Sequence, residues 1–253
     1  PEEPVAQQRK RKPIEEKESY RWLEGYRGAC EIKQTCPATL VVNMADREGD
    51  IQEWLVDAMR REPSQRAEVI IRAKCNRRLA PGAAQRYFWA ERQQTPSWGT
   101  LTLTLARQPE RPPRQVTLAV TATQVTFPGA RRPGGNLPPR EVSAVYAQEP
   151  SPPPGEAPGE WLLLTSLPVR DFASACTVVH WDRCRWEIAL FFRVRKQGCP
   201  IEQGRVQTEQ RLLNALAMYV IIAWRIHNIT MAGRAYPEVS CEIVLAPREW
   251  HTL

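Results

Sequence analysis

A basic helical face with one small residue at its centre is the part of this sequence that most directly suggests chemistry. Residues 182–197 read as a helix whose apolar side carries Trp186, Leu190 and Val194. Positions at i+3 and i+4 steps on another side carry Asp182, Arg185, Ala189, Arg193 and Lys196. Arginine and lysine suit phosphate groups, so this face is a candidate phosphate contact. A solvated amphipathic helix is the alternative.

A second candidate is Asp46, which follows a short apolar run. The runs 39–44 (TLVVNM) and 68–74 (EVIIRAK) predict strands, and 51–61 predicts a helix between them. Strand, acidic turn, helix and strand are typical of an α/β core, where ligands bind at the carboxyl ends of strands. We therefore expect Asp46 at such an end. Arg72 and Lys74 close the second strand and could line the same groove; the alternative is that they are only solvated surface residues.

The composition favours a polyanionic partner. The chain has 253 residues with 35 Lys and Arg against 28 Asp and Glu, a net charge of +7. A basic surplus of this size indicates nucleic acid or acidic lipid, although a soluble protein can simply be basic. The cations fall in small groups that could converge on one groove: 9–12, 60–61, 72–78, 131–132 and 183–196.

Other kinds of site are disfavoured. The sequence has no G-x-S-x-G elbow and no glycine-rich phosphate loop, which argues against an esterase or a nucleoside triphosphatase. Seven cysteines without a CxxC pair read as reduced thiols of a cytosolic protein. Cys176, His180 and Cys184 fall at i+4 steps, but no fourth zinc ligand accompanies them.

The chain divides into five predicted regions. Residues 1–13 are expected to be disordered and basic, with a helix from 14 to 26 opening an α/β core segment, 14–78. A β-rich insertion, 79–160, contains the alternating run TLTLTL at 100–105 and strands at 115–127 and 141–147. The core resumes over 161–232 with the strand 161–166 and helices at 173–180, 182–197 and 208–228. A tail, 233–253, has no clear pattern.

Four ordered elements resemble the insertion sequence four family of DDE transposases. They are EEKESYRWL at 15–23, ADREGD at 45–50, WLLLTSLPV from Trp161, and CRWEIALFFRVRKQG, which holds Arg185, position 189 and Lys196 at the family spacing. The resemblance covers roughly 15–230. It implies a ribonuclease-H-like fold with a β insertion before the last acidic helix.

The resemblance also implies a chemistry and its residues. The family holds two divalent ions, usually Mg²⁺ and alternatively Mn²⁺, on three carboxylates and uses them for phosphoryl transfer on DNA. Asp46 matches the metal-binding Asp, while Arg185, Arg193 and Lys196 match phosphate contacts. Trp161 and Trp186 match positions that hold a flipped base, and core packing is the alternative for both.

Departures from the family pattern predict impaired catalysis. Ala189 stands where the third acid belongs, Asp182 replaces a tyrosine, and the first catalytic Asp lies outside this chain. Glu187 is about 200° around the helix from position 189 and is no substitute. We therefore expect weakened Mg²⁺ binding and a transposase whose strand cleavage is lost or nearly so; the alternative is a non-catalytic DNA-binding remnant.

The expected setting is cytoplasmic. The resemblance implies double-stranded DNA as the partner, both at transposon ends and at the target. A second copy of the chain, in a homodimer, is a further expected partner. The apolar stretch 212–224 is too short to span a bilayer, so a buried helix and no membrane contact are expected.

Overall fold

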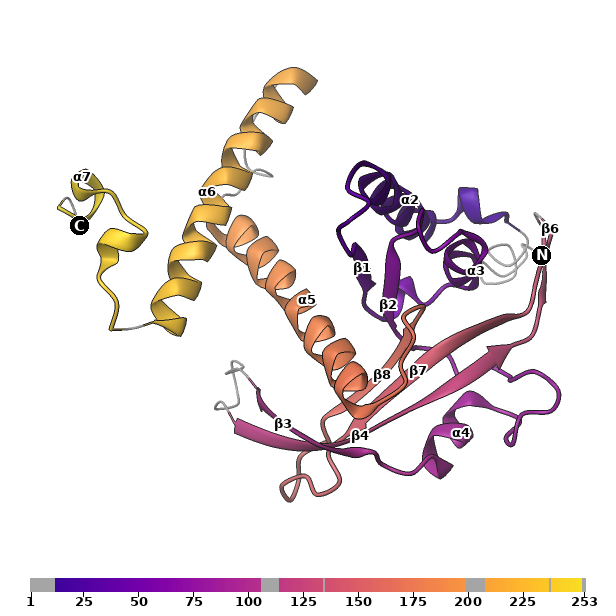
Figure 1. Cartoon of the computed structure of the whole chain (residues 1–253). Coiled ribbons are helices and arrows are strands. Elements are labelled where there is room, and N and C mark those ends of the chain that lie inside the picture. Colours follow the sequence, from indigo (N-terminus) through magenta and orange to yellow (C-terminus); the bar gives the residue numbers. More distant parts are fainter. Residues whose placement is uncertain (1–11, 106–113, 134, 199–207, 237, 252–253) are drawn as a thin grey trace, which may run out of the picture. The chain divides into compact units, whose positions relative to one another are not determined.

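The computed structural model describes residues 12–105, 114–133, 135–198, 208–236 and 238–251 (Figure 1). The chain divides into two compact units, Pro1–Asp182 and Arg183–Leu253. Most of the predicted disordered segment, 1–11, lies outside the described residues.

The first unit contains most of the regular structure. Its elements are η1 (Ile14–Glu16), α2 (Tyr20–Thr35), β1 (Val42–Ala45), η2 (Arg47–Gly49), α3 (Gln52–Arg60), β2 (Glu68–Arg72), α4 (Phe88–Gln94), β3 (Gly99–Leu105), β4 (Arg114–Phe127), β5 (Ala130–Arg132), β6 (Gly135–Leu137), β7 (Arg140–Gln148), β8 (Glu160–Thr165) and the first part of α5 (Phe172–Gly198).

Six strands form one mixed sheet in the order β1-β2-β8-β7-β4-β3. β1 and β2 are parallel, with Ala45 opposite Ile71, and the other neighbours are antiparallel. The mixed α/β class is therefore confirmed. Strands β3, β4 and β7 arise from the region expected to be an insertion, and they extend the same sheet that holds β1 and β2.

Both faces of the central strands β2 and β8 are buried, and alternate side chains along each strand pack against different helices. Ile71 of β2 packs with Trp54 of α3 and Tyr26 of α2, whereas Ile70 packs on the other face with Val179 of α5. Trp54 is fully buried and stacks on Trp22, with ring centroids 6.2 Å apart. This aromatic contact fixes α2 against α3 and holds the β1–η2–α3 segment in place.

The helices differ from the predictions in three places. The helix expected at 14–26 starts later and runs on to Thr35, because Leu23, Tyr26 and Cys30 continue one buried stripe past Gly25 and Gly28. The two helices expected at 173–180 and 182–197 are one continuous helix, α5. The short α4 was not predicted; its seven residues are too few to show a period.

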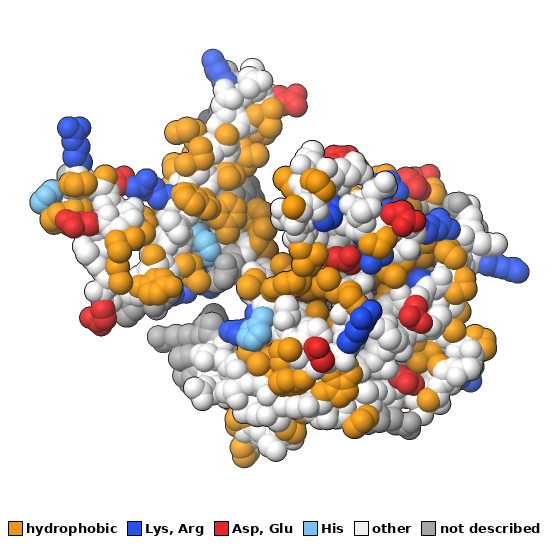
Figure 2. Space-filling view, in the orientation of Figure 1, with side chains coloured by type: hydrophobic (Ala, Val, Ile, Leu, Met, Phe, Trp, Pro, Cys, Tyr) orange, Lys and Arg blue, Asp and Glu red, His pale blue; other side chains and the backbone are white. Residues whose placement is uncertain are grey.

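The second unit contains the rest of α5, α6 (Glu209–Ala235), η4 (Cys241–Ile243) and α7 (Pro247–Trp250). The prediction that the 212–224 stretch is a buried helix is wrong: hydrophobic side chains lie exposed along α6 (Figure 2), among them Ile221 and Trp224. They surround the helix instead of forming one stripe, so a single packing face cannot cover them. By length and composition alone, Glu209–Arg234 would also pass as a membrane-spanning helix, which is weak support for such a location.

Candidate nucleic-acid interface

Asp46 lies directly after β1, at the edge of the sheet where β2 also ends. Its Oδ1 accepts a hydrogen bond of 2.9 Å from the backbone N–H of Glu48, which caps η2. Because β1 and β2 are parallel, the residues that follow both strands meet at this edge. The predicted position of Asp46 at a strand's carboxyl end is confirmed.

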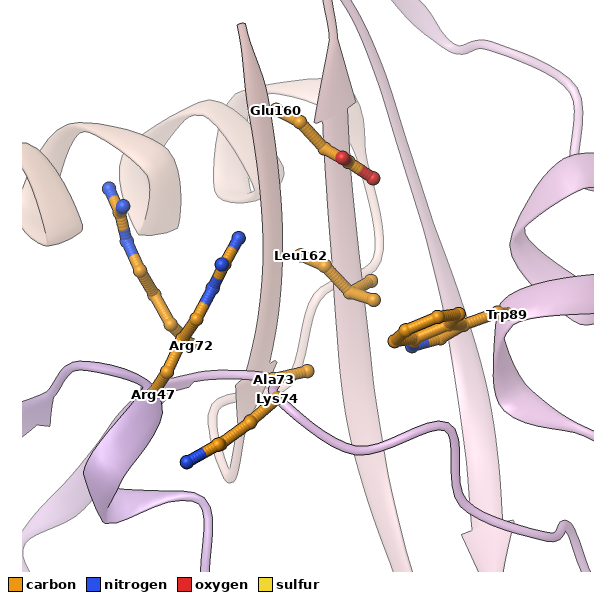
Figure 3. A pocket seen from close by; sticks show the side chains of 7 residues that line it. All are labelled: Arg47, Arg72, Ala73, Lys74, Trp89, Glu160 and Leu162. Atoms are coloured by element: carbon orange, nitrogen blue, oxygen red, sulfur yellow. The ribbon is translucent and has the colours of Figure 1, made fainter.

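A pocket of about 270 Å³ opens at this edge. We call it the edge pocket, and it is lined by Arg47, Arg72, Ala73, Lys74, Trp89, Glu160 and Leu162. Arg72 and Lys74 therefore line one pocket together with Arg47. Whether they share a groove with the predicted phosphate contacts of α5 stays a prediction, because those residues lie in the other unit. In Figure 3 the Trp89 ring faces Leu162, and the Arg47 and Arg72 side chains extend from the β1–β2 side. The lining holds three cations and one carboxylate, and it keeps a positive surplus even though Arg72 pairs with Asp182.

Arg72 is bound at one end of the pocket by Asp182. Its Nε and Nη2 donate to Asp182 Oδ2 at 2.8 and 2.5 Å, and the Asp182 side chain is fully buried. The guanidinium also lies 5.8 Å from the centroid of the Trp161 ring. Asp182, which the helical spacing placed on the candidate phosphate face, is therefore bound by Arg72. Its charge is compensated inside the unit.

Asp50 holds the loop that follows β2 against the loop that follows β1. Its Oδ2 accepts the backbone N–H groups of Lys74 and Cys75 at 2.7 and 3.0 Å. Its Oδ1 pairs with Arg77 Nη1 at 2.5 Å, and Arg77 Nη2 donates to the Asp50 carbonyl at 2.8 Å. These contacts position Lys74 in the lining. The sequence marked Asp50 only as part of ADREGD, because its partners lie 24 to 27 residues away.

The aromatic side chain in the edge pocket is Trp89, which no sequence pattern marked. Trp89 is 41% exposed, whereas Trp161 is 8% exposed and packs in the core with Leu163. Trp161 lies between Glu160 and Leu162, which line the pocket, so its side chain points to the other face of β8. Its proposed hold on a flipped base stays a prediction, but the indole surface offered here is that of Trp89.

The remaining sequence candidates lie on α5 within the second unit. Arg185 is half-buried and Arg193 is exposed. The side chains of Trp186, Ala189 and Lys196 lie outside the described residues, although the backbone there is helical. The helix predicted to carry this face is thus present. Its relation to Asp46 stays a prediction, since the two lie in different units.

The described part of the edge does not by itself supply the carboxylates of a two-metal centre. One carboxylate oxygen of Asp46 accepts a hydrogen bond from Glu48 N–H. Asp50 pairs with Arg77 and accepts hydrogen bonds from two backbone N–H groups. Over the described ranges, no three His, Cys, Asp or Glu side chains gather as ion ligands. No model of a known protein family matches the chain.

Proposed function

We propose that this chain is a degenerate relative of the insertion sequence four transposases, with a ribonuclease-H-like core, that binds double-stranded DNA without cutting it. The edge pocket is its proposed DNA contact. The observation that carries the proposal is the meeting of Arg47, Arg72 and Lys74 with an exposed tryptophan at the carboxyl edge of the parallel strand pair. Cations there would neutralise phosphates, and an indole can stack on a base.

Cleavage is not part of the proposal, because phosphoryl transfer on two metal ions needs carboxylates close to each ion. Ala189 stands at the position of the family's third acid and offers no oxygen to a metal. The edge around Asp46 is cationic, which suits a bound phosphate better than a pair of divalent ions.

The alternative is an active transposase that uses Mg²⁺ or Mn²⁺, and the placement of Asp46 at the end of β1 favours it. A nicking assay separates the two. Purified chain, divalent metal and supercoiled DNA should give no nicked product above that of Asp46→Ala. Metal-dependent nicking that disappears in Asp46→Ala would support the alternative.

DNA binding is tested by fluorescence anisotropy on a labelled 30-base-pair duplex over a salt series. Each phosphate contact contributes about 0.9 to the slope of log affinity against log salt. We expect Arg47→Gln/Lys74→Gln to weaken binding and to lower this slope by about 2. Arg170→Gln/Arg211→Gln removes equal charge and is the control, since both side chains are exposed and neither lines the pocket. An unchanged slope in the pocket variant would refute the proposed contact.

A further inference from the structure

A second basic hollow lies in the first unit, between η1, α2, α3 and the β5–β6 hairpin. It has a volume of about 420 Å³, within the range of sites that hold a nucleotide-sized ligand. None of its lining residues lines the edge pocket. Its cations are Lys12, Lys17, Arg27, Arg60, Arg61 and Arg132. In Figure 2, Lys and Arg side chains are visible at the end of the unit where β6 lies.

The charges in this hollow do not cancel. Its six cations face three carboxylates, Glu15, Glu53 and Asp57. Asp57 accepts from both Arg27, at 3.0 Å, and Arg61, at 2.8 Å, and Glu53 accepts from Arg132 at 2.8 Å. Lys12, Lys17 and Arg60 have no ion pair with another residue in the part of the chain described. The lining therefore keeps a surplus of three positive charges.

The arginines of the hollow are already fixed in position. Asp57 holds two guanidinium groups side by side, and the hydrogen bonds to it raise the pKa of both Arg27 and Arg61. Arg132 is fixed by Glu53 and by Gln52, whose Oε1 lies 3.1 Å from Arg132 Nη2. Side chains that are ordered before binding lose less entropy when a ligand arrives.

A buried cation adds to the positive potential behind Arg132. Arg140 is 4% exposed, and none of its guanidinium nitrogens has a hydrogen-bond partner among the described residues. Burial and the neighbouring Arg77 lower its pKa to about 10, and Arg132 and Glu53 also act on it. Arg77 and Arg132 therefore repel the positive charge of Arg140, and an anion placed at the Arg132 end of the hollow would reduce this repulsion.

We propose that this hollow binds phosphates of a DNA backbone and is a second DNA contact, separate from the edge pocket. An extended polyanion fits better than a lone phosphate, because the cations come from several separate elements, from the start of η1 to α2, α3 and the β5–β6 hairpin. The proposal rests on the proposed function in taking DNA as the ligand. It adds a contact that lies on α3 and the hairpin, away from the β1–β2 edge.

The test uses the 30-base-pair duplex and three double variants of the full chain. Lys12→Gln/Arg60→Gln alters the hollow at two exposed side chains, so the fold should tolerate it. Arg47→Gln/Lys74→Gln alters the edge pocket, and Arg170→Gln/Arg211→Gln is the charge-matched control. We expect the hollow variant to lower the salt slope by about 2, so that raising salt from 50 to 200 mM weakens its binding about tenfold less than that of the unaltered chain. Circular dichroism and thermal unfolding establish that each variant is folded.

The outcomes separate the two proposals. A slope lowered by the hollow variant, and lowered further when both pairs are combined, supports a second contact. A slope lowered only by the edge variant overturns the hollow and leaves the proposed function standing. If the hollow variant loses binding of inorganic phosphate, measured by calorimetry, yet keeps the full slope on DNA, the hollow is a small-anion site and the proposal fails. A slope unaffected by either variant overturns both.

Discussion

Arg72 and Asp182 form a partly buried ion pair although 110 residues separate them in the sequence. Arg72 ends β2 at the edge pocket, and Asp182 lies on α5 at the limit of the first unit. The pair therefore ties the sheet edge to the helix, and it uses the charge of one of the three pocket cations.

Asp182→Asn should lower the free energy of unfolding by about 3 kcal/mol, because it leaves the guanidinium of Arg72 without its carboxylate in a buried setting. Urea unfolding measures the loss. Glu31→Gln, an exposed change on α2, should have almost no effect. Arg72→Met/Asp182→Leu should cost less than Asp182→Asn alone. If the double variant costs as much, charge burial is not the source of the loss.

The same Asp182→Asn variant should bind DNA with a steeper salt dependence, provided that it remains folded. Removing the carboxylate charge of Asp182 raises the net positive charge beside the edge pocket by one, which predicts a slope larger by about 1. Anisotropy on the 30-base-pair duplex measures it. A slope that stays the same would mean that the added positive charge does not act on phosphate.

Much of the sheet could be predicted because its strands carry local patterns. The run 100–105 alternates apolar and polar residues, and the structure pairs it with β4 from Gly99 to Leu105. The apolar runs that became β2 and β8 are buried on both faces, as continuous hydrophobic segments should be. The position of Asp46 followed from the same reasoning, since it needed only the end of one strand.

Contacts between distant segments could not be predicted. Asp182 lay on the helix face assigned to phosphate, yet its carboxylate is bound by Arg72. Helical spacing says which residues share a face, but not which partner that face meets. Trp89 was missed for a related reason. It lies on the short helix α4, and its place in the edge pocket depends on Leu162, which is distant in the sequence.

Trp89→Ala should weaken binding of single-stranded DNA by about 5- to 150-fold, because stacking of one base on an aromatic ring is worth about 1–3 kcal/mol. The salt slope should not change, since no charge is lost. Trp98→Ala is the matched control: Trp98 is 39% exposed, close to the 41% of Trp89, and lies outside the pocket lining. Equal losses in both variants would argue against stacking at the edge pocket.

Glu149→Gln should lower the free energy of unfolding at pH 6 by about 2 kcal/mol, because it breaks a charged hydrogen-bond pair. Arg114 Nη1 and Nη2 donate to the two Glu149 oxygens at 2.5 and 2.8 Å, and Gly159 N–H donates at 3.0 Å. The bond to Arg114 is the main cause that lowers the pKa of Glu149 to about 2 from an ordinary 4.5.

This lowered pKa sets the pH dependence of the difference. The carboxylate's contribution is complete above pH 4.5 and is lost as pH falls through about 2, so the unaltered chain and Glu149→Gln should converge over that window. Urea unfolding at pH 6, 4, 3 and 2 measures the difference between the two. Glu141→Gln, an exposed change on β7, is the control. A gap that stays constant down to pH 2 would contradict the proposed linkage.

Arg140→Met should raise the free energy of unfolding by about 1 kcal/mol. The Arg140 guanidinium is buried beside Arg77, without a hydrogen-bond partner among the described residues, and burial lowers its pKa to about 10. The guanidinium lies 5.4 Å from the centroid of the Phe127 ring, and this cation–π contact offsets only part of the desolvation free energy of the buried charge. Methionine keeps most of the volume and removes the charge. Arg131→Met, on the exposed face of β5, is the control and should change stability little. A clear loss of stability in Arg140→Met would mean that the charge itself is stabilising at this position.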